Sequence, residues 1–369
     1  MNTKKIALAV FFQGGVSLEL FEKTGLFSRE MLLFEELQKK NFSVKFFTYG
    51  KNDKKYEKFL NGVKIFPKKI NIPNKLYELL ISLIYRKELK KVDILRSYQM
   101  HGSIAATISK FLYKKKLVIR QGYQLSTFLK KMKKSALVQL FAVILEYTTY
   151  KSADKIILTT EKDKDYVVRR YKIDENKIRV IPNYIDTDLF KPFKLKKIEN
   201  SLCFVGRFTQ QKNLFNLLKA IDSLNVTLTI FGSGHQEEEL KTIVKQNKLK
   251  VIFKGNIENK DLPKELNKHD LFILPSYFEG NPKVLLEAMS CGLSVIGTNV
   301  EGIKEIINHK ENGYLCNTDA ESLKKAIIEV LKNKNLQKKM KNNARKTILK
   351  EFSFKKILED EMKIYEKNL

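Results

Sequence analysis

The stretch FILPSYFEGNPKVLLEAMSCGLSVIG, residues 272–297, decides how the C-terminal half of this chain folds. An apolar strand ends at Leu274, and a polar loop with two prolines leads into a helix predicted over Lys283–Ser290. A second apolar strand follows at Ser294–Gly297. Two short apolar strands joined by a helical crossover predict a βαβ unit with parallel strands.

The same alternation extends through the rest of the chain. It predicts further strands at Lys5–Phe11, Val44–Thr48, Asp93–Leu95, Leu117–Arg120, Lys155–Leu158, Ser201–Val205, Thr227–Phe231, Val251–Lys254 and Leu271–Leu274. Helical periodicity separates them, most clearly at Phe27–Lys40 and Ala136–Tyr150. The fold class is therefore α/β, with two doubly wound, Rossmann-like domains. We predict domains at 1–182 and 183–350 and a C-terminal helix at 351–369, and we interpret Pro182–Asn200 as a linker.

Length and composition favour a large globular protein. The 369 residues are 43% hydrophobic, enough for two packed cores. Cys203, Cys291 and Cys316 show no disulfide or zinc spacing, which indicates a reducing compartment. We find no signal peptide, and the longest later apolar run is about half of what a bilayer requires. These features predict a cytoplasmic protein.

The chain is strongly basic, with a net charge of +29. Residues 1–190 carry 38 basic and 19 acidic side chains, so most of the excess lies in the N-terminal half. An anionic membrane, nucleic acid or phosphate-bearing substrates would each explain it. A compositional bias towards lysine, which supplies 61 of the 70 positive charges, is the alternative. Without Trp, zinc spacing or an arginine-rich segment, nucleic acid is not expected.

Two basic and two acidic residues have the chemistry of a ligand site. Gly206 ends a strand, and Arg207 and Lys212 follow it in positions suited to phosphate. Glu279 and Glu287 lie before and within the helix at 283–290, where carboxylates can accept sugar hydroxyls. The alternative is two exposed basic loop residues and two glutamates that complement a helix N-terminus. Taken together, they fit a nucleoside diphosphate sugar.

The C-terminal half resembles the family 4 retaining glycosyltransferases of the GT-B architecture. The resemblance lies in VGRFTQQKN at 205–213, FGSG at 231–234, residues 272–307 and ENGYL at 311–315, in the expected order. It implies two domains facing a central cleft, with the C-terminal helix returning towards the N-terminal domain. It also implies transfer with retained anomeric configuration and no metal or other cofactor, from a donor that we expect to be a UDP-sugar.

The resemblance also assigns roles to individual residues. It implies that Arg207 and Lys212 hold and neutralise the leaving diphosphate, that Glu279 contacts the transferred sugar, and that Glu287 binds the ribose. We expect these neighbouring residues to complete the donor site: Gly206, Gly280, Asn281, Lys283, Val284 and Leu285.

The N-terminal half matches less closely. Gly14–Gly15 and Gly25 both fit the family's glycine loop, and Gly25 is the better match by its distance to the next strand. We expect Gly15, Gly25, His101 and Arg120 to line the N-terminal side of the cleft. Many members have a histidine after the strand at 117–120, where this chain reads VIRQGY. That pattern resembles some polysaccharide-assembly members, so we do not interpret it as inactivation.

Lysines also precede two amphipathic segments of the N-terminal half. Lys130, Lys131, Lys133 and Lys134 precede Ala136–Leu145, and Lys68, Lys69 and Lys75 precede Leu76–Ile84. This arrangement suits docking on an anionic membrane, although ordinary core helices would give the same pattern. We therefore expect a peripheral enzyme that glycosylates a glycan or lipid-linked acceptor for capsule, lipopolysaccharide or exopolysaccharide. A nucleotide-sugar epimerase, a phosphorylase or a non-enzymatic basic binding protein is the alternative.

Overall fold

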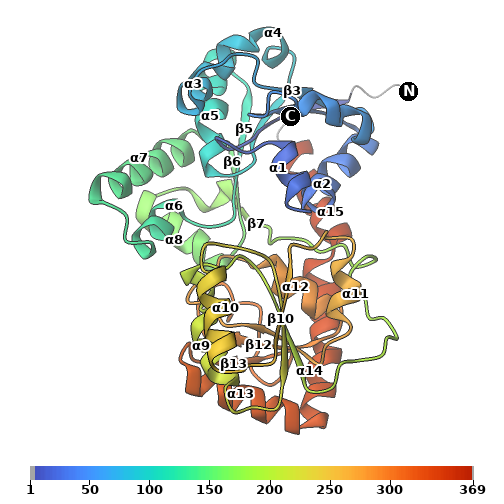
Figure 1. Cartoon of the computed structure of the whole chain (residues 1–369). Coiled ribbons are helices and arrows are strands. Elements are labelled where there is room, and N and C mark those ends of the chain that lie inside the picture. Colours follow the sequence, from blue (N-terminus) through green and yellow to red (C-terminus); the bar gives the residue numbers. More distant parts are fainter. Residues whose placement is uncertain (1–4, 368–369) are drawn as a thin grey trace. The chain divides into compact units, whose positions relative to one another are not determined.

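The computed structural model describes residues 5–367 and divides into two compact units (Figure 1). The N-terminal unit comprises Met1–Pro182 together with Ile357–Leu369, and the C-terminal unit comprises Asn183–Lys356. Each unit is built on one parallel sheet, so the predicted α/β class is confirmed.

The sheet of the N-terminal unit has the order β3-β2-β1-β4-β5-β6-β7. Its strands are β1 (Ile6–Phe11), β2 (Phe42–Phe47), β3 (Lys64–Phe66), β4 (Ile94–Ser97), β5 (Lys116–Gln121), β6 (Lys155–Leu158) and β7 (Ile178–Val180). The order reverses between β1 and β4, and right-handed crossovers then place helices on both faces. Strands covered on both faces are mostly apolar: β1 is apolar throughout, and β5 carries the buried apolar run Leu117–Ile119.

The helices of the N-terminal unit connect these strands. They are α1 (Leu18–Lys23), α2 (Phe27–Lys39), α3 (Asn74–Ile84), α4 (Arg86–Leu89), α5 (Ser103–Tyr113), α6 (Leu125–Lys131), α7 (Ala136–Ser152) and α8 (Glu161–Tyr171). The predicted helix at Ala136–Tyr150 is thus correct. The segment between the two glycine candidates, residues 16–24, contains α1.

The C-terminal unit repeats the design with the order β10-β9-β8-β11-β12-β13. Its strands are β8 (Ser201–Val205), β9 (Thr227–Phe231), β10 (Val251–Gly255), β11 (Leu271–Leu274), β12 (Ser294–Thr298) and β13 (Tyr314–Cys316). Its helices are α9 (Leu214–Ile221), α10 (Glu237–Gln246), α11 (Leu262–Leu266), α12 (Lys283–Ser290), α13 (Ala320–Lys332) and α14 (Lys334–Thr347). The order reverses between β8 and β11, and ligands of doubly wound sheets bind at such a switch point.

The predicted linker at 182–200 is wrong for most of its length. Residues from Asn183 onwards belong to the C-terminal unit, and Ile185 and Phe190 are buried in its core. The backbone N–H of Ile185 donates to the carbonyl of Phe352 at 2.8 Å, and Arg345 Nη1 donates to the carbonyl of Phe190 at 2.6 Å. Prolines and lysines suggested an open connection, but the few apolar side chains decide the packing.

The last helix, α15 (Phe354–Glu366), contributes a buried acid to the N-terminal unit. Glu361 is fully buried and lies 3.1 Å from Arg96 Nη2 and 2.7 Å from Arg120 Nη1. Tyr365 Oη donates to the same carboxylate at 2.6 Å. Burial opposes ionisation of Glu361, but Arg96 and Arg120 outweigh it and hold its pKa below the usual value. The ion pairs fix α15 on the arginine-bearing face of the sheet.

Candidate active site

The loop after β8 and the loop before α12 meet in the C-terminal unit. Lys212 Nζ lies 2.5 Å from Glu279 Oε1, and both side chains are largely buried, at 12% and 9% exposure. Ser276 Oγ donates to the same carboxylate oxygen at 2.6 Å. Two residues that the sequence assigned to one ligand from separate motifs are therefore in direct contact.

Arg207 stands apart from this contact. It follows Gly206 at the carboxyl end of β8 and is exposed. Within residues 5–367 its guanidinium has no hydrogen-bond or ion-pair partner, so its five N–H donors are free for a ligand. The next residue, Phe208, is buried in the core and fixes the loop.

The loop that carries Glu279 is held by backbone contacts. Gln211 Nε2 donates to the carbonyl of Phe278 at 2.8 Å, and the N–H of Glu279 donates to the carbonyl of Glu301 at 3.3 Å. Gly302 has φ +79°, and a Cβ there would lie 2.0 Å from the carbonyl oxygen of Gly280. Only glycine permits this approach, because a side chain at Gly302 would push the Glu279–Gly280 loop away.

The donor-side residues at the start of α12 are placed differently from one another. Leu285 is buried, so it offers only its backbone, and Val284 is partly buried. Asn281 is engaged with Asn183, whose N–H donates to Asn281 Oδ1 at 3.0 Å. Lys283 Nζ lies 5.5 Å from the centre of the Tyr184 ring. No side chain of the described residues caps the N-terminus of α12, and a helix N-terminus favours a nearby anion.

Glu287, which the sequence places off the centre of the apolar stripe of α12, is a buried carboxylate. It is fully buried on α12, and Asn259 Nδ2 donates to its Oε1 at 3.1 Å. In this structure the carboxylate faces the protein interior and is not presented to solvent. The predicted contact of Glu287 with the ribose stays a prediction.

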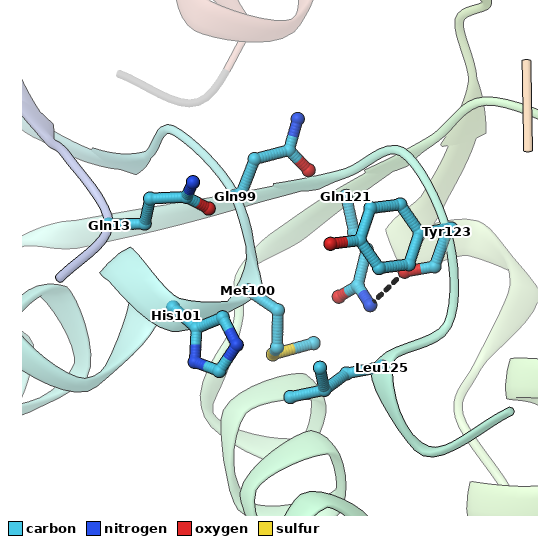
Figure 2. Close-up of a pocket in the computed structure, with 7 residues that line it drawn as sticks. All are labelled: Gln13, Gln99, Met100, His101, Gln121, Tyr123 and Leu125. Carbon is cyan, nitrogen blue, oxygen red and sulfur yellow. Dashed lines mark hydrogen bonds between the residues drawn. The ribbon is translucent and has the colours of Figure 1, made fainter. Parts of the chain in front are cut away.

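In the N-terminal unit a polar hollow lies at the carboxyl ends of β1, β4 and β5 (Figure 2). Its lining residues are Gln13, Gln99, Met100, His101, Gln121, Tyr123 and Leu125. His101 has exposed surface, yet partial burial lowers its pKa, which favours the neutral imidazole at pH 7. The next residue is Gly102, and a Cβ there would lie 2.4 Å from the carbonyl oxygen of Phe11, so a side chain would not fit at this position.

The other predicted N-terminal residues do not gather in this hollow. Gly15, with φ +83°, directly follows β1, whereas Gly25 lies in the turn between α1 and α2. Both glycines lie where the sequence placed them, Gly14–Gly15 in the loop after β1 and Gly25 before α2, and the assignment of Gly25 to the family's glycine loop stays a prediction. The Arg120 side chain is paired with Glu361 of α15, and its predicted place at the cleft stays a prediction.

Sequence reasoning missed several polar groups at this edge of the sheet. Gln13, Gln99 and Gln121 each follow or end a buried strand, a signal that could have identified them. Glu78 on α3 lies against Gly14, its exposure is 8%, and its Oε1 has no hydrogen-bond partner among the described residues. Burial raises the pKa of Glu78 to about 7.

Comparisons with known proteins identify the family of the chain and support its fold. A family model described as "Glycosyl transferases group 1" matches residues 186–347, and one described as "Glycosyltransferase Family 4" matches residues 31–189. Sucrose-phosphate synthase from Thermosynechococcus elongatus has a TM-score of 0.82 at 21% identity, covering 99% of both chains. HepE of Anabaena in complex with UDP has a TM-score of 0.79 at 17% identity, covering 98% of this chain and 100% of that one. These structures support the fold.

Curated relatives carry the comparison to sequence. The N-acetylgalactosamine-N,N'-diacetylbacillosaminyl-diphospho-undecaprenol 4-alpha-N-acetylgalactosaminyltransferase of Campylobacter jejuni is 30% identical over 269 residues, covering 70% of this chain and 72% of that protein. The UDP-Gal:alpha-D-GlcNAc-diphosphoundecaprenol alpha-1,3-galactosyltransferase of Escherichia coli is 27% identical, covering 75% and 76%. With an uncharacterized glycosyltransferase of Haemophilus influenzae, 30% identical, the alignment covers 58% of this chain and only 62% of the relative. Two family models that together run from residue 31 to 347, and a relative matched over most of its length, show that this chain belongs to the group 1 and family 4 glycosyltransferases.

Proposed function

We propose that this protein transfers a sugar from a UDP-sugar to a glycan or lipid-linked acceptor, with retention of configuration and without a metal ion. The observation that carries the proposal is the contact of Lys212, Glu279 and Ser276 on the loops that also hold the free guanidinium of Arg207. Fixed positive groups beside a carboxylate suit a leaving diphosphate and a sugar that becomes cationic.

Lys212 can donate hydrogen bonds to the Glu279 carboxylate and to a phosphate at the same time. An ammonium has three N–H donors, and one of them suffices for Glu279. Arg207 would bind the diphosphate through its planar fork, and the N-terminus of α12 would add to the same field. These groups would neutralise the charge that develops when the sugar–phosphate bond breaks.

The reaction requires no group outside the chain and its substrates. The bond between the anomeric carbon and the diphosphate oxygen breaks, and the acceptor oxygen bonds to the same face of that carbon. The acceptor hydroxyl proton passes to the departing diphosphate. Glu279, held by Lys212 and Ser276, would orient the hydroxyls of the transferred sugar.

The substrate classes are supported by what similar proteins are named for. HepE was solved with UDP and with UDP-glucose, and the Escherichia coli relative is named for UDP-Gal and a diphosphoundecaprenol acceptor. A relative from Klebsiella pneumoniae is named for a cps region. We therefore propose a role in capsule, lipopolysaccharide or exopolysaccharide assembly, performed at the inner face of the cell membrane. Among the described residues no helix is long and apolar enough to cross a membrane.

A nucleotide panel tests the donor side directly. We expect UDP to raise the melting temperature of the wild type, and GDP, ADP, CMP and TDP to raise it less. A ligand at about 100 times its Kd stabilises by roughly 2.7 kcal/mol, which such an assay resolves. Arg207→Ala with Lys212→Ala should abolish the shift, whereas Lys219→Ala, an exposed lysine on α9, should keep it. No shift with any nucleotide would contradict the proposal.

Product analysis tests the chemistry. With UDP-sugar and a diphospholipid-linked acceptor, we expect UDP release and an axial or equatorial linkage that matches the donor, read by NMR of the anomeric proton. Activity should survive EDTA. Release of a changed free sugar without acceptor would instead identify a nucleotide-sugar epimerase.

A further inference from the structure

Helix α7 of the N-terminal unit exposes an apolar stripe. Leu137 is 80% exposed, Leu140 55%, Phe141 62%, Ile144 52% and Tyr147 49%. Their spacing of three and four residues aligns them along one side of the helix. The other side, which includes Ala142, Leu145 and Tyr150, packs into the unit, so α7 is apolar on both faces. Scattered exposed apolar side chains are ordinary, but a continuous stripe marks an interaction surface.

A turn rich in lysine lies at the N-terminal end of this stripe. Lys130, Lys131, Lys133 and Lys134 are exposed, and Met132 between them is 45% exposed. Gln139 Nε2 on α7 donates to the carbonyl of Lys134 at 2.7 Å, which ties the turn to the helix. The one acid of α7, Glu146, is buried and accepts from Ser126 Oγ at 2.5 Å, so no carboxylate of α7 offsets the lysines.

The neighbouring helices have a similar character. Ser103 Oγ of α5 lies 3.0 Å from Thr149 Oγ1 of α7, and Ser82 Oγ of α3 lies 2.8 Å from Ser109 Oγ of α5. The three helices therefore pack in series in the N-terminal unit, as Figure 1 also shows. Exposed apolar side chains continue on both neighbours: Leu76, Leu79 and Leu83 on α3, and Phe111 and Leu112 on α5.

We propose that the stripe on α7 and the lysine turn before it form a docking surface for an anionic phospholipid bilayer. The apolar side chains enter the boundary between headgroups and acyl chains, and the lysine ammonium groups lie at the lipid phosphates. The 17-residue helix carries Gln139 and Glu146 and lies along the bilayer surface without spanning it. An apolar stripe bordered by charges of one sign fits a surface of opposite charge better than it fits a second copy with the same lysines.

Of the two segments that the sequence singled out for a membrane, the structure favours this one. Lys68, which precedes α3, is buried, and its Nζ donates to Asn74 Oδ1 at 2.7 Å and to the carbonyl of Ile72. That lysine is used inside the protein. Lys69 and Lys75 are exposed, so the α3 segment presents two lysines, whereas all four lysines before α7 are exposed.

Vesicle flotation tests the surface. The purified full chain is mixed with vesicles of phosphatidylcholine and phosphatidylglycerol, or of phosphatidylcholine alone, at low and at high salt. We expect the wild type to float with the anionic vesicles at low salt and to lose most of that binding at high salt. Leu137→Ser with Phe141→Ser, and separately the change of the four lysines to Gln, should each weaken binding about tenfold or more.

The control replaces exposed apolar side chains of the C-terminal unit, Ile252→Ser with Leu349→Ser, and should bind like the wild type. Circular dichroism and the nucleotide melting shift check that every variant is folded. Equal binding by wild type and by the α7 variant, or no binding to anionic vesicles at low salt, would overturn the proposal. A dimer that exists without lipid and is lost on Leu137→Ser with Phe141→Ser would assign the stripe to a second copy.

The inference shares only the membrane location with the proposed function, and the two can fail separately. Vesicle binding without sugar transfer would support the docking surface and contradict the proposed transferase activity. Transfer to a water-soluble acceptor without vesicle binding would do the reverse.

Discussion

In the C-terminal unit the side chains of the motifs contact one another, whereas the N-terminal unit exposes an apolar stripe and many lysines. Lys212, Glu279 and Ser276 form one contact below the surface. The N-terminal unit exposes the stripe on α7 and holds most of the excess positive charge, with 38 basic and 19 acidic residues before residue 191. Under the proposed function, the C-terminal unit binds a donor common to many enzymes, which constrains its residues closely, whereas the acceptor of the N-terminal unit varies from enzyme to enzyme. This difference explains why the family motifs are plain in one half and faint in the other.

The largest effect should come from the buried acid that serves the N-terminal unit. Glu361→Gln would leave Arg96 and Arg120 without a compensating charge, and breaking such a buried pair costs about 3–5 kcal/mol. Urea unfolding measures the loss, with the exposed Glu359→Gln on the same helix as control. A loss below about 1 kcal/mol would mean that the ion pairs do not hold α15.

Single changes at the donor side should act mainly on rate, although Lys212→Ala also removes the partner of the largely buried Glu279 and should lower stability as well. Arg207→Ala or Lys212→Ala should lower kcat/KM about a hundred- to thousandfold, as the loss of one oxyanion donor does. Lys219→Ala is the matched control. If either variant keeps more than about a tenth of the activity, that residue is not a carrier of the leaving-group charge.

The third prediction concerns Glu78, which links stability to pH in the N-terminal unit. Burial raises its pKa from 4.5 to about 7, so Glu78 stays protonated to a higher pH in the folded state than in the unfolded state. The stabilisation that this tighter proton binding gives the folded state is complete below the pKa of Glu78 in the unfolded state. It is lost as the pH rises through the pKa of Glu78 in the folded state, and the total loss is on the order of 3 kcal/mol. Glu78→Gln should remove this loss. Urea midpoints of both proteins at about pH 5 and about pH 7.5 test it; parallel changes in the two would exclude Glu78 as the cause.

The smallest effect should come from Ser276→Ala. It removes the hydroxyl that donates to Glu279 Oε1 but leaves the Lys212 contact intact. A hydrogen bond to a charged group contributes roughly 1.5–3 kcal/mol, so kcat should fall about tenfold with a small change in KM. Ser276→Thr, which retains the hydroxyl, should recover part of the rate. An unchanged kcat would show that Lys212 alone positions Glu279.

The sequence predicted the inner strands well. The predicted bounds Ser201–Val205, Thr227–Phe231 and Leu271–Leu274 are those of β8, β9 and β11. Strands covered on both faces are short apolar runs between polar turns, and this pattern is visible in a single sequence. The edge strand β3, with three residues, carries too little pattern to be recognised.

Contacts between residues far apart in the sequence could not be predicted from such local patterns. Lys212 and Glu279 are 67 residues apart, and the chemistry of their motifs placed them at one ligand without predicting their direct contact. Helical periodicity left Glu287 off the apolar stripe, but its burial depends on Asn259, 28 residues away. The stripe on α7 was predicted as an amphipathic helix, and only the fold decides which of its two apolar faces is covered.

The position of Glu361 also has a consequence for synthesis. Arg96 and Arg120 leave the ribosome early, but the acid that neutralises them is made only after the entire C-terminal unit. Until then, the nascent N-terminal sheet must leave these arginines hydrated and one face uncovered. Completion of the N-terminal unit therefore has to wait until α15 is translated, and a chain stopped before Glu361 should be held by chaperones or degraded.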